Sequence, residues 1–236
     1  MDADSTGPRA VAGIEPSRAP LWFIGTWLIG SIGGGIALAA MHSGDDDAPI
    51  GALAVSLVAL WAINVAGCVL ASRTDGTGSL RVDLGVAARP VDAAGFLIGA
   101  IAQVALVPVT YIPLRAIWPD TFSRERLEET ARDLVDRAEG GLVVLLVVLV
   151  AIGAPLVEEL VYRGLLQRPA LTAFPRVPVI VLVAAVFALI HFRPVEYPGL
   201  FVAGLVFGVC AAATGRLGMA VAAHVGFNAT GLALVL

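Results

Sequence analysis

Long apolar stretches without charged residues constrain this chain more than any other feature. The clearest covers residues 140–157, eighteen positions without a charge. A helix needs about twenty mainly apolar residues to cross a bilayer, and it satisfies its own backbone hydrogen bonds there. With 58% hydrophobic and 14% charged residues, the chain has too little polar surface for a soluble globule. The sequence therefore predicts an all-α fold, a polytopic transmembrane helical bundle.

Seven membrane segments can be drawn along the chain. They cover residues 21–41, 50–72, 93–114, 140–168, 178–192, 198–214 and 217–236. The first is longer than the apolar core of a secretory signal and fits a signal anchor better. Pro108 and Pro113 predict a kink near the end of the third segment, because proline cannot donate a helical hydrogen bond. The fifth and sixth segments are short.

The remaining regions define the predicted domain organisation. Residues 1–20 are polar and rich in Pro, Gly and Ala, which predicts a disordered N-terminal arm. Residues 21–236 are expected to form a single integral membrane domain whose motif-bearing core is residues 140–236. Directly before this core, residues 121–139 predict an amphipathic helix with Leu127, Leu134 and Val135 on one face. We interpret it as a solvated or interfacial connector.

The distribution of arginine favours one orientation in the membrane. All fifteen basic residues are arginines. If the N-terminus is cytoplasmic, the inside segments hold nine of them, and cytoplasmic loops of membrane proteins are enriched in such residues. The sequence thus predicts a cytoplasmic N-terminus and an external C-terminus, in a multi-pass protein of a prokaryotic plasma membrane.

Composition also bounds the partners. The net charge of −4 is small, and no basic cluster of the kind that binds phosphates occurs along the sequence, so nucleic acid is not an expected partner. Cys68 and Cys210 lie in apolar stretches without metal or redox spacing, which predicts two small buried hydrophobes. The expected partners are the lipid bilayer and a membrane-associated peptide or protein.

Two adjacent acidic residues are the first candidates for chemistry. Glu158 and Glu159 follow directly on the charge-free stretch, and a carboxylate in or beside hydrocarbon is costly and usually functional. On a helix their side chains point about 100° apart, so they cannot face one site equally. Arg163 lies four residues after Glu159, on the same face, and permits an ion pair. Glu158 would then remain free to project elsewhere, although both carboxylates could also be solvated at the membrane border.

Two histidines lie in later apolar stretches. His191 follows Phe187 by about one helical turn, which permits ring packing, although a histidine at the end of a short segment is often interfacial. His224 lies near the middle of the last segment, with Asn228 on the same face. His224 and Asn228 each need a hydrogen-bonding partner in hydrocarbon. A purely structural hydrogen bond between helices would also meet this need.

Taken together, these side chains predict a hydrolytic site between three segments. Glu and His are zinc ligands, and zinc bound by Glu158, His191 and His224 would keep a position for water and make hydroxide available near neutral pH. Without a metal, Glu158 could act as general base. His224 and Asn228 could then stabilise the oxyanion of a tetrahedral intermediate. The residue types leave both schemes open.

The spacing of these residues also matches a known pattern. Residues 158–163 fit EExxxR, residues 187–191 fit FxxxH and residues 224–228 fit HxxxN. Their order and intervals over residues 140–236 resemble the type II CAAX prenyl endopeptidase and bacteriocin-processing family of intramembrane proteases. The first three membrane segments match no pattern of this kind, and family members often have eight segments rather than seven.

The resemblance implies an intramembrane metalloendopeptidase with a cavity open to the cytoplasm. By this likeness Glu158 and His191 would activate water, and His224 with Asn228 would stabilise the oxyanion. Glu159 and Arg163 would form a supporting pair, and zinc is the implied cofactor. The substrate would be a membrane-associated protein or peptide, prenylated in the CAAX-type case.

Two other functions are compatible with the sequence. A polytopic carrier could use Glu158 and the histidines as a proton or cation relay, although no two-halved repeat typical of secondary transporters is visible. A non-catalytic membrane scaffold or immunity protein could also retain the motifs. The complete set of Glu, His, His and Asn argues against that alternative, because a decayed site would lose these residues first.

Overall fold

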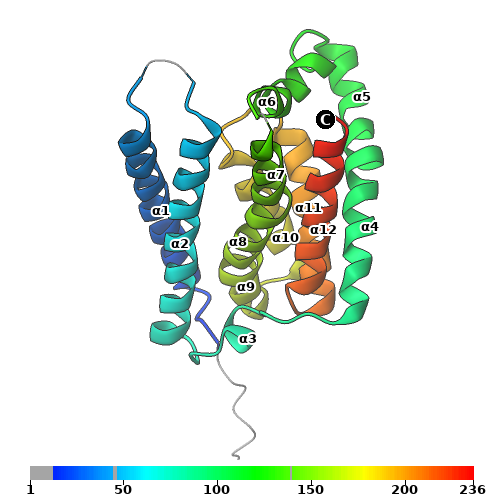
Figure 1. Cartoon of the computed structure of the whole chain (residues 1–236). Helices are drawn as coiled ribbons and strands as arrows, with labels where there is room; N and C mark the ends of the chain where they lie inside the picture. Colours follow the sequence, from blue (N-terminus) through cyan, green and yellow to red (C-terminus); the bar gives the residue numbers. More distant parts are fainter. Residues whose placement is uncertain (1–12, 45–46, 139) are drawn as a thin grey trace, which may run out of the picture.

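The computed structural model describes residues 13–44, 47–138 and 140–236, and all of its regular elements in these ranges are helices (Figure 1). The predicted all-α class is confirmed. Five helices are long and apolar enough to cross a membrane, namely 19–41, 50–75, 90–117, 141–173 and 197–214. The other two predicted segments form shorter helices, of 14 and 16 residues. The chain is an integral membrane protein.

Helices α1 (Ala19–Met41) and α2 (Ile50–Asp75) form an antiparallel pair at one side of the bundle (Figure 1). Small residues let their backbones approach. A Cβ atom at Gly30 would lie 2.8 Å from Oδ1 of Asn64, and the Gly34 carbonyl accepts a hydrogen bond from Ser56 at 2.9 Å.

The predicted N-terminal arm overlaps this helix pair. Ala19 and Pro20 are the first residues of α1, and Ile14 and Ala19 are buried against the core. Burial of apolar side chains orders the end of the arm, so the membrane domain begins before residue 21. Residues 1–12 lie outside the described residues.

A linker and a long helix follow α2. The linker contains the short α3 (Leu80–Asp83) and leads into a helix over residues 90–117 that includes α4 (Ala94–Ile101) and α5 (Val107–Ile117). A π-helical stretch, Ala102–Leu106, immediately precedes Val107 and Pro108. A widened turn is one way for a helix to accommodate a proline that cannot donate to the preceding turn. The helix continues through Pro113 to Ile117.

The predicted amphipathic connector is α6 (Arg124–Asp136). Ser123 caps its first turn by accepting a hydrogen bond from the backbone N–H of Arg126. Leu134 and Val135 pack in a cluster with the buried Ile50 of α2 and Leu146 of α7. The charged side chains of α6 are exposed, apart from the half-buried Glu128. Residue 139, the last of the predicted connector, lies outside the described residues.

One helix of 33 residues, 141–173, carries the glutamate pair through the centre of the bundle (Figure 1). It comprises α7 (Gly141–Val148), α8 (Ala154–Glu159) and α9 (Arg168–Ala173). Two π-helical stretches, Leu149–Gly153 and Leu160–Gln167, separate them. The helix extends five residues beyond the predicted end at residue 168, which places Glu158 and Glu159 near its middle.

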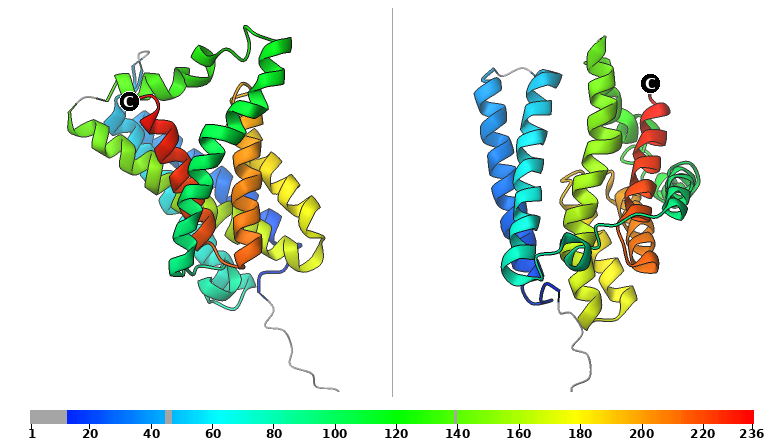
Figure 2. Two further views of the ribbon diagram at one scale, coloured as in Figure 1. Left: turned by 90° about the vertical axis from the view of Figure 1, so that its right-hand side faces the viewer. Right: turned by 60° about the horizontal axis from the view of Figure 1, so that its bottom comes forward.

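The last three helices surround this segment. They are α10 (Arg176–Leu189), α11 (Tyr197–Thr214) and α12 (Gly218–Ala233). Helix α12 lies between α4 and α11, and the C-terminus is at the end of the bundle opposite the start of α1 (Figures 1 and 2). Gly95, Gly99 and Gly226 make the close contact of α4 with α12 feasible, because a Cβ atom at any of them would overlap the facing backbone. Cys68 and Cys210 are buried free thiols, as predicted.

Candidate active site

The EExxxR motif forms a buried ion pair. Nη1 of Arg163 donates to Oε1 of Glu159 at 2.8 Å, and neither side chain is exposed at all. This is the i, i+4 pair expected from helical spacing. Glu158, one residue earlier, is directed elsewhere and keeps 27% of its side chain exposed. The two glutamates therefore occupy different environments, as their 100° separation on a helix requires.

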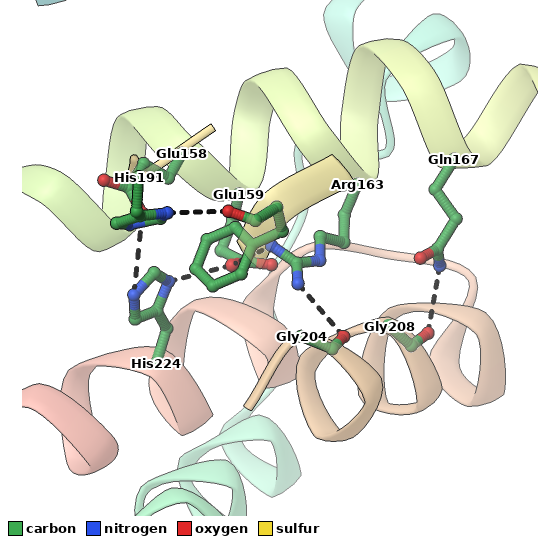
Figure 3. Close-up of polar contacts among 9 residues, drawn as sticks. Glu158, Glu159, Arg163, Gln167, His191, Gly204, Gly208 and His224 are labelled. Atoms are coloured by element: carbon green, nitrogen blue, oxygen red, sulfur yellow. Dashed lines mark hydrogen bonds and ion pairs between the residues drawn. The ribbon is translucent and has the colours of Figure 1, made fainter. Parts of the chain in front are cut away.

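Arg163 also ties the helix over residues 141–173, here called the site helix, to α11. Its Nη2 donates to the Gly204 carbonyl at 3.1 Å, and one turn further Nε2 of Gln167 donates to the Gly208 carbonyl at 2.9 Å (Figure 3). Glycine at position 204 also allows α10 to pack closely on α11, since a Cβ atom there would lie 3.0 Å from Ala184. Residues 160–167 are π-helical, a form often found at functional sites.

Aromatic rings surround the Arg163 guanidinium. Its Cζ atom lies 4.8 Å from the ring centre of Phe187 and 5.4 Å from that of Phe207. A cation over an aromatic face is attracted by the ring quadrupole, and the attraction grows when water is excluded. The rings thus contribute to keeping a charged group inside the bundle.

His224 is held by the same carboxylate as Arg163. Its Nδ1 lies 2.9 Å from Oε1 of Glu159, and its ring stacks on Phe207 with centroids 4.3 Å apart. Because a carboxylate can only accept, Nδ1 must carry a proton. The opposite ring nitrogen, Nε2, faces Glu158 and lies 3.7 Å from its Oε2 (Figure 3). Glu159 therefore orients His224 toward Glu158.

His191 lies two residues beyond the end of α10 and is anchored in a similar way. Its Nδ1 is 2.6 Å from the Phe187 carbonyl oxygen, so this nitrogen is the protonated one and Nε2 is left as an acceptor. The rings of His191 and Phe187 pack edge to face at 4.9 Å, which confirms the predicted ring contact. The following loop is fixed by Tyr111, whose hydroxyl donates to the Val195 carbonyl at 2.8 Å.

Asn228 lies on the same side of α12 as His224. Its Nδ2 donates to the Val150 carbonyl at 2.9 Å, within the first π-helical stretch of the site helix. An amide nitrogen carries two donors, so one hydrogen atom of Asn228 is not used by this bond.

These side chains share one cavity of about 240 Å³. Glu158, His191, His224 and Asn228 all line it, together with apolar residues that include Trp61 and Phe227. The structure thus brings together the four residues predicted to be catalytic, from three separate parts of the sequence. Phe187, predicted to support them, also lines the cavity, whereas the supporting pair of Glu159 and Arg163 is buried outside its lining.

Comparison with known proteins finds a family match over the part of the chain that contains the site. Residues 140–230 match the family described as type II CAAX prenyl endopeptidase Rce1-like. The C-terminal part of this chain is therefore similar to the Rce1-like family, and we call residues 140–230 the Rce1-like region. No significant match was found among curated proteins or among solved structures. The Rce1-like region starts one residue before the site helix and includes all seven site and supporting residues.

The zinc predicted for this Rce1-like site is supported by residue type but not by arrangement. Both histidines direct Nδ1 to an acceptor and leave Nε2 available, which is the usual orientation of metal-ligating histidines. Over residues 13–44, 47–138 and 140–236, however, no three His, Cys, Asp or Glu groups are gathered closely enough to hold a metal ion. Zinc binding therefore stays a prediction.

Sequence reasoning missed four residues that position the site. Gln167 follows Arg163 at helical spacing, and that spacing was an available signal. Gly204 and Gly208 are themselves four residues apart, and they supply the carbonyls that Arg163 and Gln167 bind. Tyr111 had no local signal, because its partner is 84 residues away.

Proposed function

We propose that the chain is an intramembrane endopeptidase that hydrolyses a peptide bond of a membrane-associated protein or peptide. The observation that carries the proposal is the pairing of Glu158 with Nε2 of His224, 3.7 Å apart at a shared cavity, while Glu159 holds the other face of the ring. A base next to an oriented imidazole is suited to activating water.

The hydrogen-bonding capacities around the cavity match the needs of amide hydrolysis. Glu158 and Nε2 of His191 are acceptors, and together they could hold and polarise a water molecule. Asn228 has an N–H not used by Val150, and a protonated His224 would donate from Nε2. Donors of this kind stabilise the oxyanion of a tetrahedral intermediate.

The reaction then proceeds in two proton transfers. Glu158 takes a proton from water as the water oxygen bonds to the carbonyl carbon, and the carbonyl oxygen becomes the oxyanion. When the intermediate collapses, the C–N bond breaks and the leaving amine takes that proton from Glu158. The carboxylate is restored for the next cycle.

The cellular setting is part of the proposal. An excess of arginine on one side favours a cytoplasmic N-terminus in a prokaryotic plasma membrane. The Rce1-like region favours a substrate of the CAAX type, with a prenylated C-terminus, among the membrane-associated peptides.

Peptide-bond cleavage by purified protein tests the proposal. Wild type and Glu158→Gln would be incubated with membrane-tethered and prenylated peptides, and products identified by mass spectrometry. We expect cleavage by wild type and at least a 100-fold loss in the variant, since general-base catalysis contributes on the order of 10²–10⁴-fold. Glu129→Gln, on the exposed face of α6, is the matched control.

The outcomes separate the alternatives. Undiminished cleavage by a folded Glu158→Gln protein would refute the assignment. Loss of wild-type cleavage after 1,10-phenanthroline, restored by added zinc, would establish a metalloprotease, and insensitivity would leave the glutamate as the base. Absence of cleavage across the panel would favour the carrier or scaffold functions.

A further inference from the structure

Four arginines that are distant in sequence meet at one end of the bundle. Arg81 and Arg89 come from the linker between α2 and α4, Arg168 from the end of the site helix, and Arg216 from the turn before α12. They line a cavity of about 410 Å³, and none of the described residues that line it is acidic. The sequence contains no basic cluster that predicts a phosphate site, because these residues come together only through the fold.

The walls of this arginine cavity are built from close backbone contacts. The linker runs in extended form across the end of the bundle toward α4 (Figure 2). The N–H of Leu217 donates to the Gly85 carbonyl at 2.9 Å, and that of Gly218 donates to Ala87 at 3.1 Å. Gly85 has φ +73°, and a Cβ atom there would lie 3.0 Å from Nη1 of Arg168. The backbone and the arginine therefore fit together only with glycine at this position.

Arg168 joins two walls of the arginine cavity, the linker and the turn between α11 and α12. Its Nε donates to the Val82 carbonyl at 3.0 Å and its Nη1 to the Gly215 carbonyl at 2.7 Å. Both partners are neutral, so the guanidinium keeps its full charge at the cavity.

One of the four arginines is neutralised. Arg216 binds Asp92 in a two-point contact of 2.8 and 2.6 Å, and the backbone N–H of Arg89 donates to the same carboxylate. The carboxylate of Asp92 raises the pKa of Arg216. Among the residues that the structure describes, Arg81, Arg89 and Arg168 form no ion pair with a carboxylate. The cavity therefore carries an excess of about three positive charges, counted from these pairings.

We propose that the arginine cavity binds the phosphate headgroup of an anionic phospholipid. Guanidinium groups match phosphate oxygens in two-point hydrogen bonds. The four residues lie where membrane helices end, so a phosphate in the cavity would be at headgroup level. Val82, Val86 and Val91 are exposed beside the arginines, and apolar side chains next to cationic ones are typical of a lipid interface. A soluble phosphate compound has no acyl chains that could contact these valines.

Lipid bound there would contact the site helix directly. Arg168 lies five residues before the end of the same helix that carries Glu158, and the linker and the α11–α12 turn form the other walls. The lipid would thus add a contact between three segments that backbone hydrogen bonds and the side chains of Arg168 and Arg216 already join.

Native mass spectrometry of the full chain tests the proposal. Protein would be released from mixed micelles that contain equal amounts of phosphatidylglycerol and phosphatidylcholine, and bound lipids counted. We expect preferential retention of phosphatidylglycerol by wild type. Each arginine near an anionic lipid surface contributes on the order of a fivefold preference, so Arg81→Gln/Arg89→Gln should lose about 25-fold. These two side chains are exposed, and their removal leaves the Arg168 and Arg216 contacts intact.

The control carries the same charge change elsewhere. Arg18→Gln/Arg73→Gln removes two exposed arginines outside this cavity, near the same end of the bundle, and should keep the lipid preference. Equal retention of both lipids by wild type, or equal loss in both double variants, would overturn the proposal.

Inorganic phosphate and glycerol 3-phosphate form a third arm of the experiment. Binding of these at the same affinity, without lipid preference, would also overturn it and identify a soluble-phosphate site. Peptidase activity is not measured, so failure here is distinct from failure of the proposed function.

Discussion

The buried pair of Glu159 and Arg163 allows a quantitative prediction. Both side chains are fully buried and joined at 2.8 Å, and Glu159 also accepts from His224. Glu159→Gln keeps the shape of the side chain but removes its charge. Arg163 would then be an uncompensated cation in the bundle. Removal of one partner of a buried ion pair costs about 3–5 kcal/mol, and we expect a loss of that size in the free energy of unfolding.

Reversible unfolding in mixed detergent micelles measures this loss. Glu128→Gln on α6 is the matched control, because Glu128 pairs with Arg124 and Arg132 at the surface. Exposed pairs contribute less than about 1 kcal/mol. A loss below about 1 kcal/mol in Glu159→Gln would refute the view that this pair is sequestered from solvent.

A double variant separates stability from orientation. Glu159→Leu/Arg163→Met replaces both charges by apolar groups of comparable length, and such replacements are often neutral or stabilising. We expect the double variant to be more stable than Glu159→Gln. It should nevertheless be inactive, because Nδ1 of His224 loses its acceptor. A double variant with wild-type cleavage would show that Glu159 does not position the ring.

The remaining predictions concern packing and the loop after His191. Gly99→Ala should destabilise the protein by several kcal/mol, more than the usual cost of overpacking, about 1–3 kcal/mol, since its Cβ atom would overlap the backbone of Ala223. Gly35→Ala meets open space and should instead stabilise α1 by about 0.5–1 kcal/mol; thermal unfolding of both variants tests this contrast. Tyr111→Phe loses its hydrogen bond to Val195, so it should cost about 1 kcal/mol and lower kcat more than it changes KM in a cleavage assay.

Local sequence patterns were sufficient to predict the helices and the residue pairs within one helix. Apolar length predicted the membrane segments, because a bilayer imposes a minimum span. Helical periodicity predicted the Glu159–Arg163 pair and the contact of Phe187 with His191. It also placed Glu158 apart from Glu159. These inferences succeed because the geometry of an isolated helix relates residues three or four positions apart, whatever surrounds it.

Contacts between helices were decided only by the tertiary structure. The bond of His224 to Glu159 joins positions 65 residues apart, and that of Arg163 to Gly204 joins positions 41 apart. Such pairs depend on which faces meet and on small residues that let backbones approach. The arginine cavity is the extreme case, since Arg81 and Arg216 share no local pattern. Spacing along the chain determined which residues could act together, and packing between helices determined which of them do.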